Sequence, residues 1–304
     1  MNIMITGGAG FVGSQIGLHL RNSGHTVTLL DNMSYGKKDN LEVDGKMVYD
    51  KFILDDIRNA TFEEHCKGMD VVIHLAGIAP LPECHSAPIK AYDNNLLGTL
   101  NVLETCRKVG VKKIIFSSTS AVYENCEIYP LTENKIEKEP DLVYSMSKRA
   151  CELACQSYTQ NYKMDITVLR FFNVYGPHQD FMRKQPPLMG YITKCLLDDV
   201  TPTFYSDGNQ QRDYVYIEDI FRMVDLILDS TNTSGEIFNV CTNKAYSVKE
   251  IYDLYQKVFG RYREPVFEPS VNFWDRYPEL FEGAYSLSKK RLIKEVDKYS
   301  LGSY

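Results

Sequence analysis

A tyrosine and a lysine four residues apart, Tyr144 and Lys148, have the side chains in this sequence best suited to acid–base chemistry. They begin a segment predicted to be a helix as far as about Asn161, so this spacing places them on one face. A free tyrosine has a pKa near 10, so a phenol that acts as a base near pH 7 needs nearby positive charge to stabilise its anion. The Lys148 ammonium supplies such a charge and can also hold the ribose hydroxyls of a nucleotide cofactor. In isolation the same pair would more often be a surface aromatic beside a solvated lysine, so the surrounding elements have to decide.

A cluster of hydroxyls lies upstream of this pair. The apolar run Lys113 to Ser117 predicts a strand, and Ser118-Thr119-Ser120 follows at its carboxyl end. Such clusters often only cap or turn the chain. Because the predicted strand would deliver them to the edge of the sheet that also holds the glycines described next, a catalytic role for one of them is plausible.

The first fourteen residues predict a nucleotide site. Met1 to Thr6 is an apolar run typical of a buried strand, and it leads into Gly7-Gly8-Ala9-Gly10-Phe11-Val12-Gly13, which opens a helix ending near Asn22. Glycines there let a pyrophosphate approach the helix N-terminus, whose free N–H groups and dipole hold the anion. A second predicted strand closes on Asp31, 18 residues past Gly13. An acid at about that offset binds the adenosine ribose and repels a 2′-phosphate, which favours NAD over NADP.

Alternating strands and helices predict the fold that positions these groups. Extended segments at 47–54, 71–77 and 165–170 alternate with helical ones at 61–66 and 93–109. Such alternation is typical of a parallel, doubly wound α/β sheet, whose ligand lies at the carboxyl ends of the strands. Asp55 to Ile57 and Leu75 to Gly77 fall at that edge. His74 is expected to be a hydrogen-bonded strand histidine.

The second half of the chain is expected to build a smaller domain. Residues 171–177 form a turn-rich exit from the sheet, 211–217 and 236–240 are predicted strands around a helix at 218–228, and the second of these strands should return to the main sheet. From Ser247 we expect one amphipathic helix, irregular sequence around Trp274 and a final charged helix. The predicted domains are 1–172 plus about 209–244 for NAD, and about 173–208 plus 245–304, mostly C-terminal and α/β, for the substrate.

Composition limits the partners. Over 304 residues the chain is 44% hydrophobic and 24% charged, with a formal net charge of −6, which argues against a nucleic-acid groove or an anionic membrane surface. No run approaches the roughly 20 apolar residues of a spanning helix, so a cytoplasmic protein is expected. The eight cysteines include no C-x-x-C pair and are expected to be reduced packing thiols. No metal is expected, because the adjacent pairs at 65–66 and 84–85 have no partner pair at ligand spacing.

A series of motifs resembles the extended short-chain dehydrogenase/reductases, and most closely their nucleotide-sugar epimerase/dehydratase branch. The resemblance covers residues 1 to about 245. It implies a Rossmann fold, NAD as cofactor, a UDP-linked nucleotide-sugar substrate as in the UDP-sugar 4-epimerases, and a homodimer built from the helices at 93–109 and 144–161. The motifs are Thr6 to Gly13, Asp31-Asn32, Asp56-Ile57-Arg58, His74 to Gly77, Asn94-Asn95, Ser118 to Tyr123, Tyr144-x-x-x-Lys148, Arg170 to Pro177 and Arg212 to Val215.

The same resemblance implies a role for each matching residue. Tyr144 would be the general base, Lys148 its electrostatic partner, and Thr119 the hydroxyl that orients the sugar oxygen. The second domain would close over the sugar nucleotide, with substrate contacts from Thr119, Asn173, Thr203, Tyr205 and Arg212, whose guanidinium suits a diphosphate. The cofactor contacts implied are Gly7, Gly10, Phe11, Val12, Gly13, Asp31, Asn32, Asp56, Ile57, Leu75, Ala76, Gly77, Asn94, Tyr144, Lys148 and Phe172.

The residues after Thr119 help to choose the reaction. Family members that eliminate water resemble Thr-Asp-Glu at this point, and UDP-glucuronate decarboxylases resemble Thr-Ser-Glu. Here the run is Thr119-Ser120-Ala121, and an alanine moves no proton. We therefore expect 4-epimerisation of a UDP-hexose or UDP-uronate through a transient 4-keto sugar.

Three alternatives remain open: a nucleotide-sugar 4,6-dehydratase, a UDP-glucuronate decarboxylase, and a non-catalytic NAD-binding regulator on the same fold. Three positions depart from the family near the expected sugar pocket. Glu124 stands where glycine is usual, His178 where an arginine often occurs, and Cys84 where familiar UDP-galactose 4-epimerases resemble serine. The sugar is therefore left open.

Overall fold

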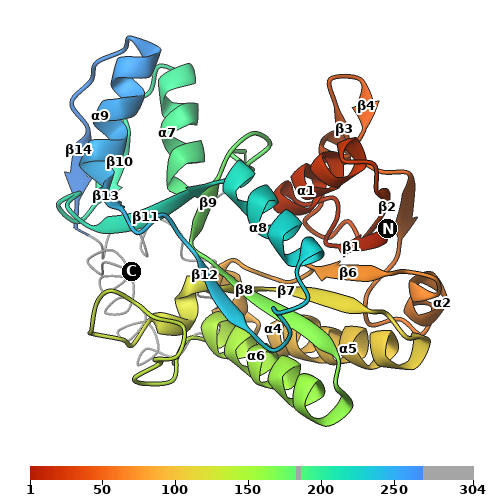
Figure 1. Cartoon of the computed structure of the whole chain (residues 1–304). Helices are drawn as coiled ribbons and strands as arrows, with labels where there is room; N and C mark the ends of the chain where they lie inside the picture. The colour runs from red at the N-terminus through yellow and green to blue at the C-terminus, as the bar shows by residue number, and fades with distance from the viewer. Residues whose placement is uncertain (183–185, 270–304) are drawn as a thin grey trace. The chain divides into compact units, whose positions relative to one another are not determined.

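The structure is a computed structural model and describes residues 1–182 and 186–269 (Figure 1). The predicted segments around Trp274 and the final helix lie outside the described residues. Contacts divide the chain into two compact units, Met1–Phe172 with Tyr216–Val240, and Asn173–Val215 with Cys241–Tyr304.

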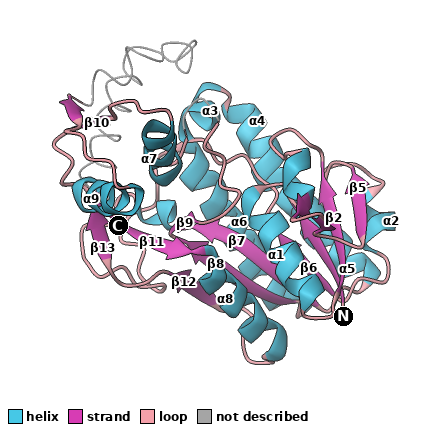
Figure 2. Cartoon of the chain, turned by 90° about the horizontal axis from the view of Figure 1, so that it is seen from above, coloured by secondary structure: helices cyan, strands magenta, loops and turns pink. Residues whose placement is uncertain are grey.

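The first unit is built on a seven-stranded parallel sheet in the order β12-β8-β7-β6-β1-β2-β5. Figure 2 shows β12, β8 and β7 side by side. This confirms the predicted doubly wound fold, including the return of β12 to the main sheet. The strands are β1 (Asn2–Thr6), β2 (Thr26–Asp31), β5 (Lys51–Leu54), β6 (Val71–His74), β7 (Lys113–Thr119), β8 (Asp165–Phe171) and β12 (Ile237–Val240).

Helices cover both faces of this sheet. α1 and α8 lie together on one face, and α5 and α6 on the other (Figure 1). The core on the α5 and α6 side joins strand residues such as Met4, Val72 and Ile114 to helix residues such as Val102 and Cys151, and burial of this apolar surface is the main stabilising contribution. The helices of this unit are α1 (Phe11–Asn22), α2 (Phe62–Cys66), α3 (Leu81–Ser86), α4 (Pro88–Tyr92), α5 (Gly98–Val109), α6 (Val143–Tyr162) and α8 (Ile217–Asp229).

Two predicted elements differ in detail. The extended segment expected at 47–54 is broken between β4 (Lys46–Met47), which pairs with β3 (Glu42–Val43), and β5. Asp50 holds the break, because its carboxylate accepts hydrogen bonds from the Val27 N–H at 2.8 Å and the Arg21 Nε at 3.0 Å. The helix expected at 93–109 begins as a π-helical turn (Asp93–Leu97) and continues as α5.

The second unit has its own small core. Its three-stranded sheet, β13-β11-β9, consists of Ala245–Ser247, Gln211–Tyr216 and Asn173–Tyr175, and β10 (Thr203–Tyr205) pairs with β14 (Val266–Glu268). Apolar residues of α7 (Leu188–Leu197) and α9 (Val248–Phe259) pack with Phe204. Residues 209–215, expected with the NAD-binding domain, belong here because β11 pairs with β13.

The buried histidine of β6 is hydrogen-bonded through both ring nitrogens. His74 contacts the hydroxyls of Thr6 at 2.7 Å and Thr99 at 3.0 Å, and burial lowers its pKa to about 3, so it is a neutral strand histidine as expected. Seven of the eight cysteines are buried thiols, and Cys241 is exposed. Within residues 1–182 and 186–269 we find no cluster of three or more metal-ligating side chains. Over the same residues, each helix is too short or too polar to cross a bilayer.

Candidate active site

The glycine-rich turn joins β1 to α1 by a path that side chains would block. Gly7 has a φ of +70°, and a Cβ there would lie 2.8 Å from the backbone nitrogen of Ala76. A Cβ on Gly13 would lie 2.3 Å from the carbonyl oxygen of Gly7. The first turn of α1 therefore packs directly on the turn and leaves its N-terminus open, which is the arrangement that binds a pyrophosphate.

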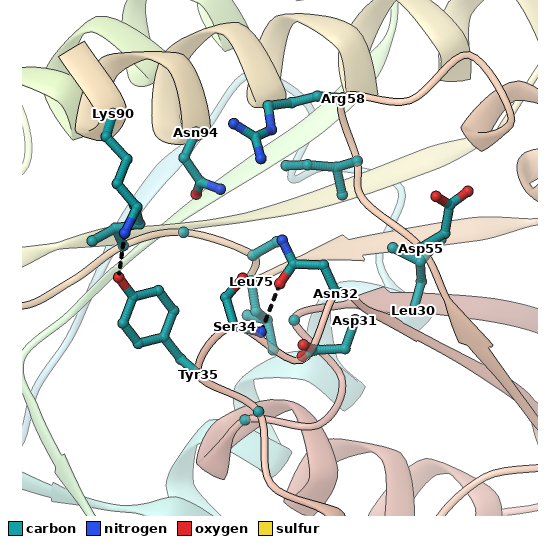
Figure 3. Close-up of a pocket in the computed structure, with 17 residues that line it drawn as sticks. Leu30, Asp31, Asn32, Ser34, Tyr35, Asp55, Arg58, Leu75, Lys90 and Asn94 are labelled. Carbon is teal, nitrogen blue, oxygen red and sulfur yellow. Dashed lines mark hydrogen bonds between the residues drawn. The ribbon is translucent and has the colours of Figure 1, made fainter. Parts of the chain in front are cut away.

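A pocket opens beside this turn, at the carboxyl ends of β1, β2, β5 and β6 (Figure 3). It collects more than half of the residues predicted to bind NAD. Those that line it are Gly7, Gly10, Asp31, Asn32, Ile57, Leu75, Ala76, Gly77 and Asn94. The other predicted cofactor residues, Phe11, Val12, Gly13, Asp56, Tyr144, Lys148 and Phe172, are not part of its lining.

Asp31 ends β2 with its carboxylate fixed in the pocket wall. It accepts hydrogen bonds from the N–H groups of Ala9 at 3.0 Å and Met33 at 2.7 Å. Burial raises its pKa, although the two backbone donors oppose that shift. The side chain is thus held at the edge of the glycine-rich turn, where a carboxylate suits ribose hydroxyls and disfavours a 2′-phosphate.

A second carboxylate, that of Asp56, is held by one arginine and one amide. Asp56 accepts hydrogen bonds from Arg58 and from the Asn32 amide at 2.7 Å, and the Arg58 hydrogen bond is the largest of the causes that hold its pKa well below the usual range. Arg58 also pairs with Asp93. Asp56 therefore lies behind the lining and orients Asn32 and Arg58, both of which line the pocket.

The residues present fit a dinucleotide. The pocket combines an open helix N-terminus, a fixed ribose-binding carboxylate and an unsatisfied amide, because the buried Oδ1 of Asn94 has no hydrogen-bond partner among the described residues. A buried polar atom without a partner is costly, so its position on the pocket wall indicates that a ligand completes it.

Some lining residues were not predicted. The Ser34 to Gly36 loop after β2 and Lys90 on α4 face each other across the pocket, and Figure 3 shows Tyr35 and Lys90 pointing toward one another. The Lys90 Nζ lies 2.9 Å from Glu83, which also accepts a hydrogen bond from Tyr35. Leu30, Asp55, Arg58 and Ile78 complete the lining. Of these, only Asp55 lay in a segment expected at the ligand edge.

Tyr144 lies in the first turn of α6, and its phenol is hydrogen-bonded to Thr119 at the end of β7. The Thr119 Oγ accepts the Ala121 N–H at 3.2 Å, which leaves its own proton for the phenol oxygen. Burial raises the pKa of Tyr144 to about 12, while the Thr119 hydrogen bond lowers it. The ring also packs against the cluster that contains Ile78 and Cys84, and Ile78 lines the cofactor pocket.

Lys148 is buried one turn further along α6. Its Nζ donates to the Ser117 carbonyl at 2.7 Å and lies 4.8 Å from the centre of the Phe116 ring. Burial lowers its pKa. A Cβ built on Gly77 would lie 3.6 Å from this Nζ. The ammonium therefore lies close to Gly77, which lines the pocket.

An ion pair buried between β8 and α6 supports this arrangement. The Arg170 guanidinium donates to Glu152 through Nε and Nη2, both at 2.8 Å, and Glu152 accepts the Ser118 hydroxyl at 2.5 Å. Arg170 and Glu152 are 1% and 0% exposed, so neither charge has water to replace its partner. The network ties β7 and β8 to the helix that carries Tyr144 and Lys148.

The predicted diphosphate-binding residues lie in the second unit. The Asn173 amide on β9 donates to the Asp213 carbonyl on β11 at 3.0 Å, which places Asn173 beside the strand that carries Arg212. Thr203 and Tyr205 lie on β10, which pairs with β14 in a separate two-stranded sheet.

Comparison with known proteins decides the family. The family model described as the NAD dependent epimerase/dehydratase family matches residues 3–241. The chain belongs to this family. As a member of the epimerase/dehydratase family it uses NAD as its cofactor.

Individual relatives of this family member are 4-epimerases by name. A putative UDP-glucose 4-epimerase from Methanocaldococcus jannaschii is 34% identical over 269 residues, covering 88% of this chain and 85% of that protein. The crystal structure of a Thermotoga maritima UDP-glucose 4-epimerase with UDP-glucose superposes with a TM-score of 0.81 at 33% identity over 88% of this chain and 86% of that one. A Bacillus cereus UDP-glucuronic acid 4-epimerase, solved with UDP-glucuronic acid and NAD, gives 0.78 at 29% identity over 88% and 86% of the two chains.

Proposed function

We propose that this family member is an NAD-dependent 4-epimerase of UDP-linked sugars, of the hexose or uronate type. The observation that carries the proposal is the placement of Tyr144 and Lys148 one helical turn apart on α6, with the Thr119 hydroxyl beside the phenol, in the same unit as the NAD pocket. The names of the relatives and the substrates in their crystal structures support the same reaction class.

The roles of the side chains follow from their chemistry. Tyr144 takes the proton from the sugar C4 hydroxyl and later returns one, while Thr119 orients the phenol and the sugar oxygen. When bound, NAD supplies the hydride acceptor that gives a 4-keto sugar and the hydride donor that reduces it on the other face. Lys148 holds the ribose of the cofactor and stabilises the tyrosinate by its positive charge. In the second unit, Asn173 and Arg212 hold the nucleotide diphosphate, and Thr203 and Tyr205 lie near its base.

The activation of Tyr144 sets a requirement. With a pKa of about 12, the phenol lies about five units above neutral pH, which corresponds to roughly 7 kcal/mol of stabilisation of the anion. Thr119, Lys148 and the charge of the oxidised cofactor have the right sign to contribute. The base should therefore be active only in the loaded enzyme.

The 3-10 turn η3 (Ser120–Tyr123) favours epimerisation over elimination or decarboxylation. Ser120 and Ala121 follow Thr119 there and offer no carboxylate for a second proton transfer. A 4,6-dehydratase needs such groups at the reacting carbons, whereas 4-epimerisation does not.

Incubation with candidate sugar nucleotides tests the proposal. The purified protein is mixed with UDP-glucose, UDP-N-acetylglucosamine or UDP-glucuronate and the products are followed by NMR and mass spectrometry. We expect a C4 epimer of unchanged mass without added oxidant. Loss of water or carbon dioxide would replace the epimerase by a dehydratase or decarboxylase, and bound NAD without any sugar conversion would indicate a regulator.

We also propose that the protein is a homodimer in the cytoplasm. α6 leaves large apolar side chains exposed, including Leu153 at 48% and Tyr162 at 54% exposure. Burial of such side chains against a second copy would be favourable. Leu153→Glu should therefore shift the sedimentation coefficient to that of a monomer, and an unchanged value would exclude this face. The cytoplasmic location remains a prediction from the sequence.

A further inference from the structure

Glu124 is a buried carboxylate that the proposed reaction does not use. It follows η3 directly and is 3% exposed. A carboxylate in such a place has to be hydrogen-bonded, because its ionised form is strongly disfavoured away from water. The partners of Glu124 therefore show what it is for.

Three hydrogen-bond donors to Glu124 lie around the start of α6. Oε1 accepts the backbone N–H of Leu142 at 2.7 Å and also that of Asp141. Oε2 accepts the hydroxyl of Ser145 at 2.7 Å. Tyr144 lies between these contacts in the chain.

The helix has no cap of its own at this end. Leu142 occupies the N-cap position, and a leucine side chain cannot accept a hydrogen bond from the free N–H groups of the first turn. The Glu124 carboxylate, which lies 17 or more residues earlier in the chain, accepts hydrogen bonds there instead. Its charge lies near the positive end of the helix dipole.

The turn that carries Glu124 is itself anchored. Tyr123, the residue before it, accepts a hydrogen bond from Arg170 and donates one to Asn239 at 2.8 Å. Thr119 stands immediately before the same turn and contacts the phenol of Tyr144. Thr119 and Glu124 therefore flank one short turn. Thr119 contacts the phenol of Tyr144, and Glu124 contacts the backbone around Tyr144.

We propose that Glu124 is a positioning residue that fixes the first turn of α6 and so sets where the Tyr144 hydroxyl meets the sugar. This inference rests on the proposed role of Tyr144 as the base. The contribution comes from hydrogen-bond geometry, since a negative charge near the phenol disfavours the phenolate. Glutamine should replace Glu124 well, because its carbonyl can accept both backbone N–H groups and its amide can donate to the Ser145 hydroxyl.

The test compares Glu124→Ala and Glu124→Gln with a matched control, using a UDP-sugar that the wild-type protein converts. Glu137 is the control, because it also accepts two backbone N–H groups, from Glu127 and Ile128, but none in α6. We expect Glu124→Ala to lower kcat by about tenfold to a hundredfold, the range that a displaced catalytic group produces, with KM and bound NAD unchanged. Glu124→Gln and Glu137→Ala should keep kcat within about threefold of the wild type, well inside that range.

The outcomes distinguish a failure of the role of Glu124 from a failure of the proposed function. A folded Glu124→Ala protein with wild-type kcat would overturn the inference, as would a Glu124→Gln protein as slow as the alanine variant. If the alanine variant does not fold, Glu124→Asp, whose carboxylate is one methylene shorter, carries the same expectation. Tyr144→Phe is measured in parallel: full activity there would remove the proposed function itself, whereas loss of activity there with normal Glu124→Ala would remove only the role of Glu124.

Discussion

Replacing Thr119 by valine should move the pH dependence of catalysis. The Thr119 hydroxyl donates to the phenol of Tyr144 and thereby lowers a pKa that burial has raised to about 12. A hydrogen bond to a charged group contributes about 1.5 to 3 kcal/mol, which corresponds to roughly one to two pKa units. Valine has nearly the same shape but no hydroxyl, so the tyrosinate loses this stabilisation.

The sign of the effect is defined. Loss of the donor raises the pKa of Tyr144, so at a given pH a smaller fraction is ionised and kcat falls. The acidic limb of the kcat profile should shift upward by one to two pH units, and kcat near pH 7 should fall about tenfold to a hundredfold. Activity should recover as the pH rises.

The assay is kcat for epimerisation, measured from pH 5 to pH 10, with bound NAD quantified in each sample. Thr119→Ser keeps the hydroxyl and should keep the acidic limb within about half a pH unit of the wild type, since the donor to the phenolate remains. The account of Tyr144 as a hydrogen-bonded base is refuted if the valine variant leaves the limb in place, or if valine and serine shift it equally.

Three further perturbations address the cofactor site and the framework. Gly13→Ala would place a Cβ 2.3 Å from the Gly7 carbonyl oxygen and should abolish NAD retention, measured as NAD released on denaturation; a loaded variant would show that the turn can widen. Asp31→Asn removes the charge that opposes a 2′-phosphate. The NADP dissociation constant divided by that of NAD, measured by calorimetry, should fall by about tenfold or more, which corresponds to at least about 1.4 kcal/mol. An unchanged ratio would mean that another group selects the cofactor. Arg170→Met leaves the buried Glu152 with Arg149 as its one remaining cationic partner among the described residues. It should lower the free energy of unfolding by about 3 kcal/mol in urea melts, while adding Glu152→Gln should recover part of the loss.

The residues within single elements could be predicted from the sequence. The glycine-rich turn, Asp31 and the Tyr144-x-x-x-Lys148 pair depend on local spacing, and the structure places the first two in the pocket and the pair on α6. The parallel, doubly wound sheet could be predicted from the alternation of strands with helices, because parallel strands need crossovers.

Residues that depend on contacts between distant segments could not be predicted in this way. Lys90 lines the pocket from α4, a five-residue helix too short to leave a periodic pattern. Glu124 accepts a hydrogen bond from Ser145 of α6, which is 21 residues away, and nothing in the local sequence of Glu124 predicts that partner. The segment 209–215 joined the second unit because β11 pairs with β13, and strand pairing is not encoded in the strand alone.

The most direct test of the account is turnover in deuterium oxide, with the wild-type protein and Tyr144→Phe compared on the same UDP-sugar. If a hydride leaves C4 and returns from the bound cofactor while Tyr144 moves only the hydroxyl proton, the epimer should form with no deuterium on carbon and no change in mass. The phenylalanine variant should be slower by about a hundredfold to ten-thousandfold. Deuterium at C4, a product that has lost water or carbon dioxide, or a phenylalanine variant at nearly full rate would contradict it.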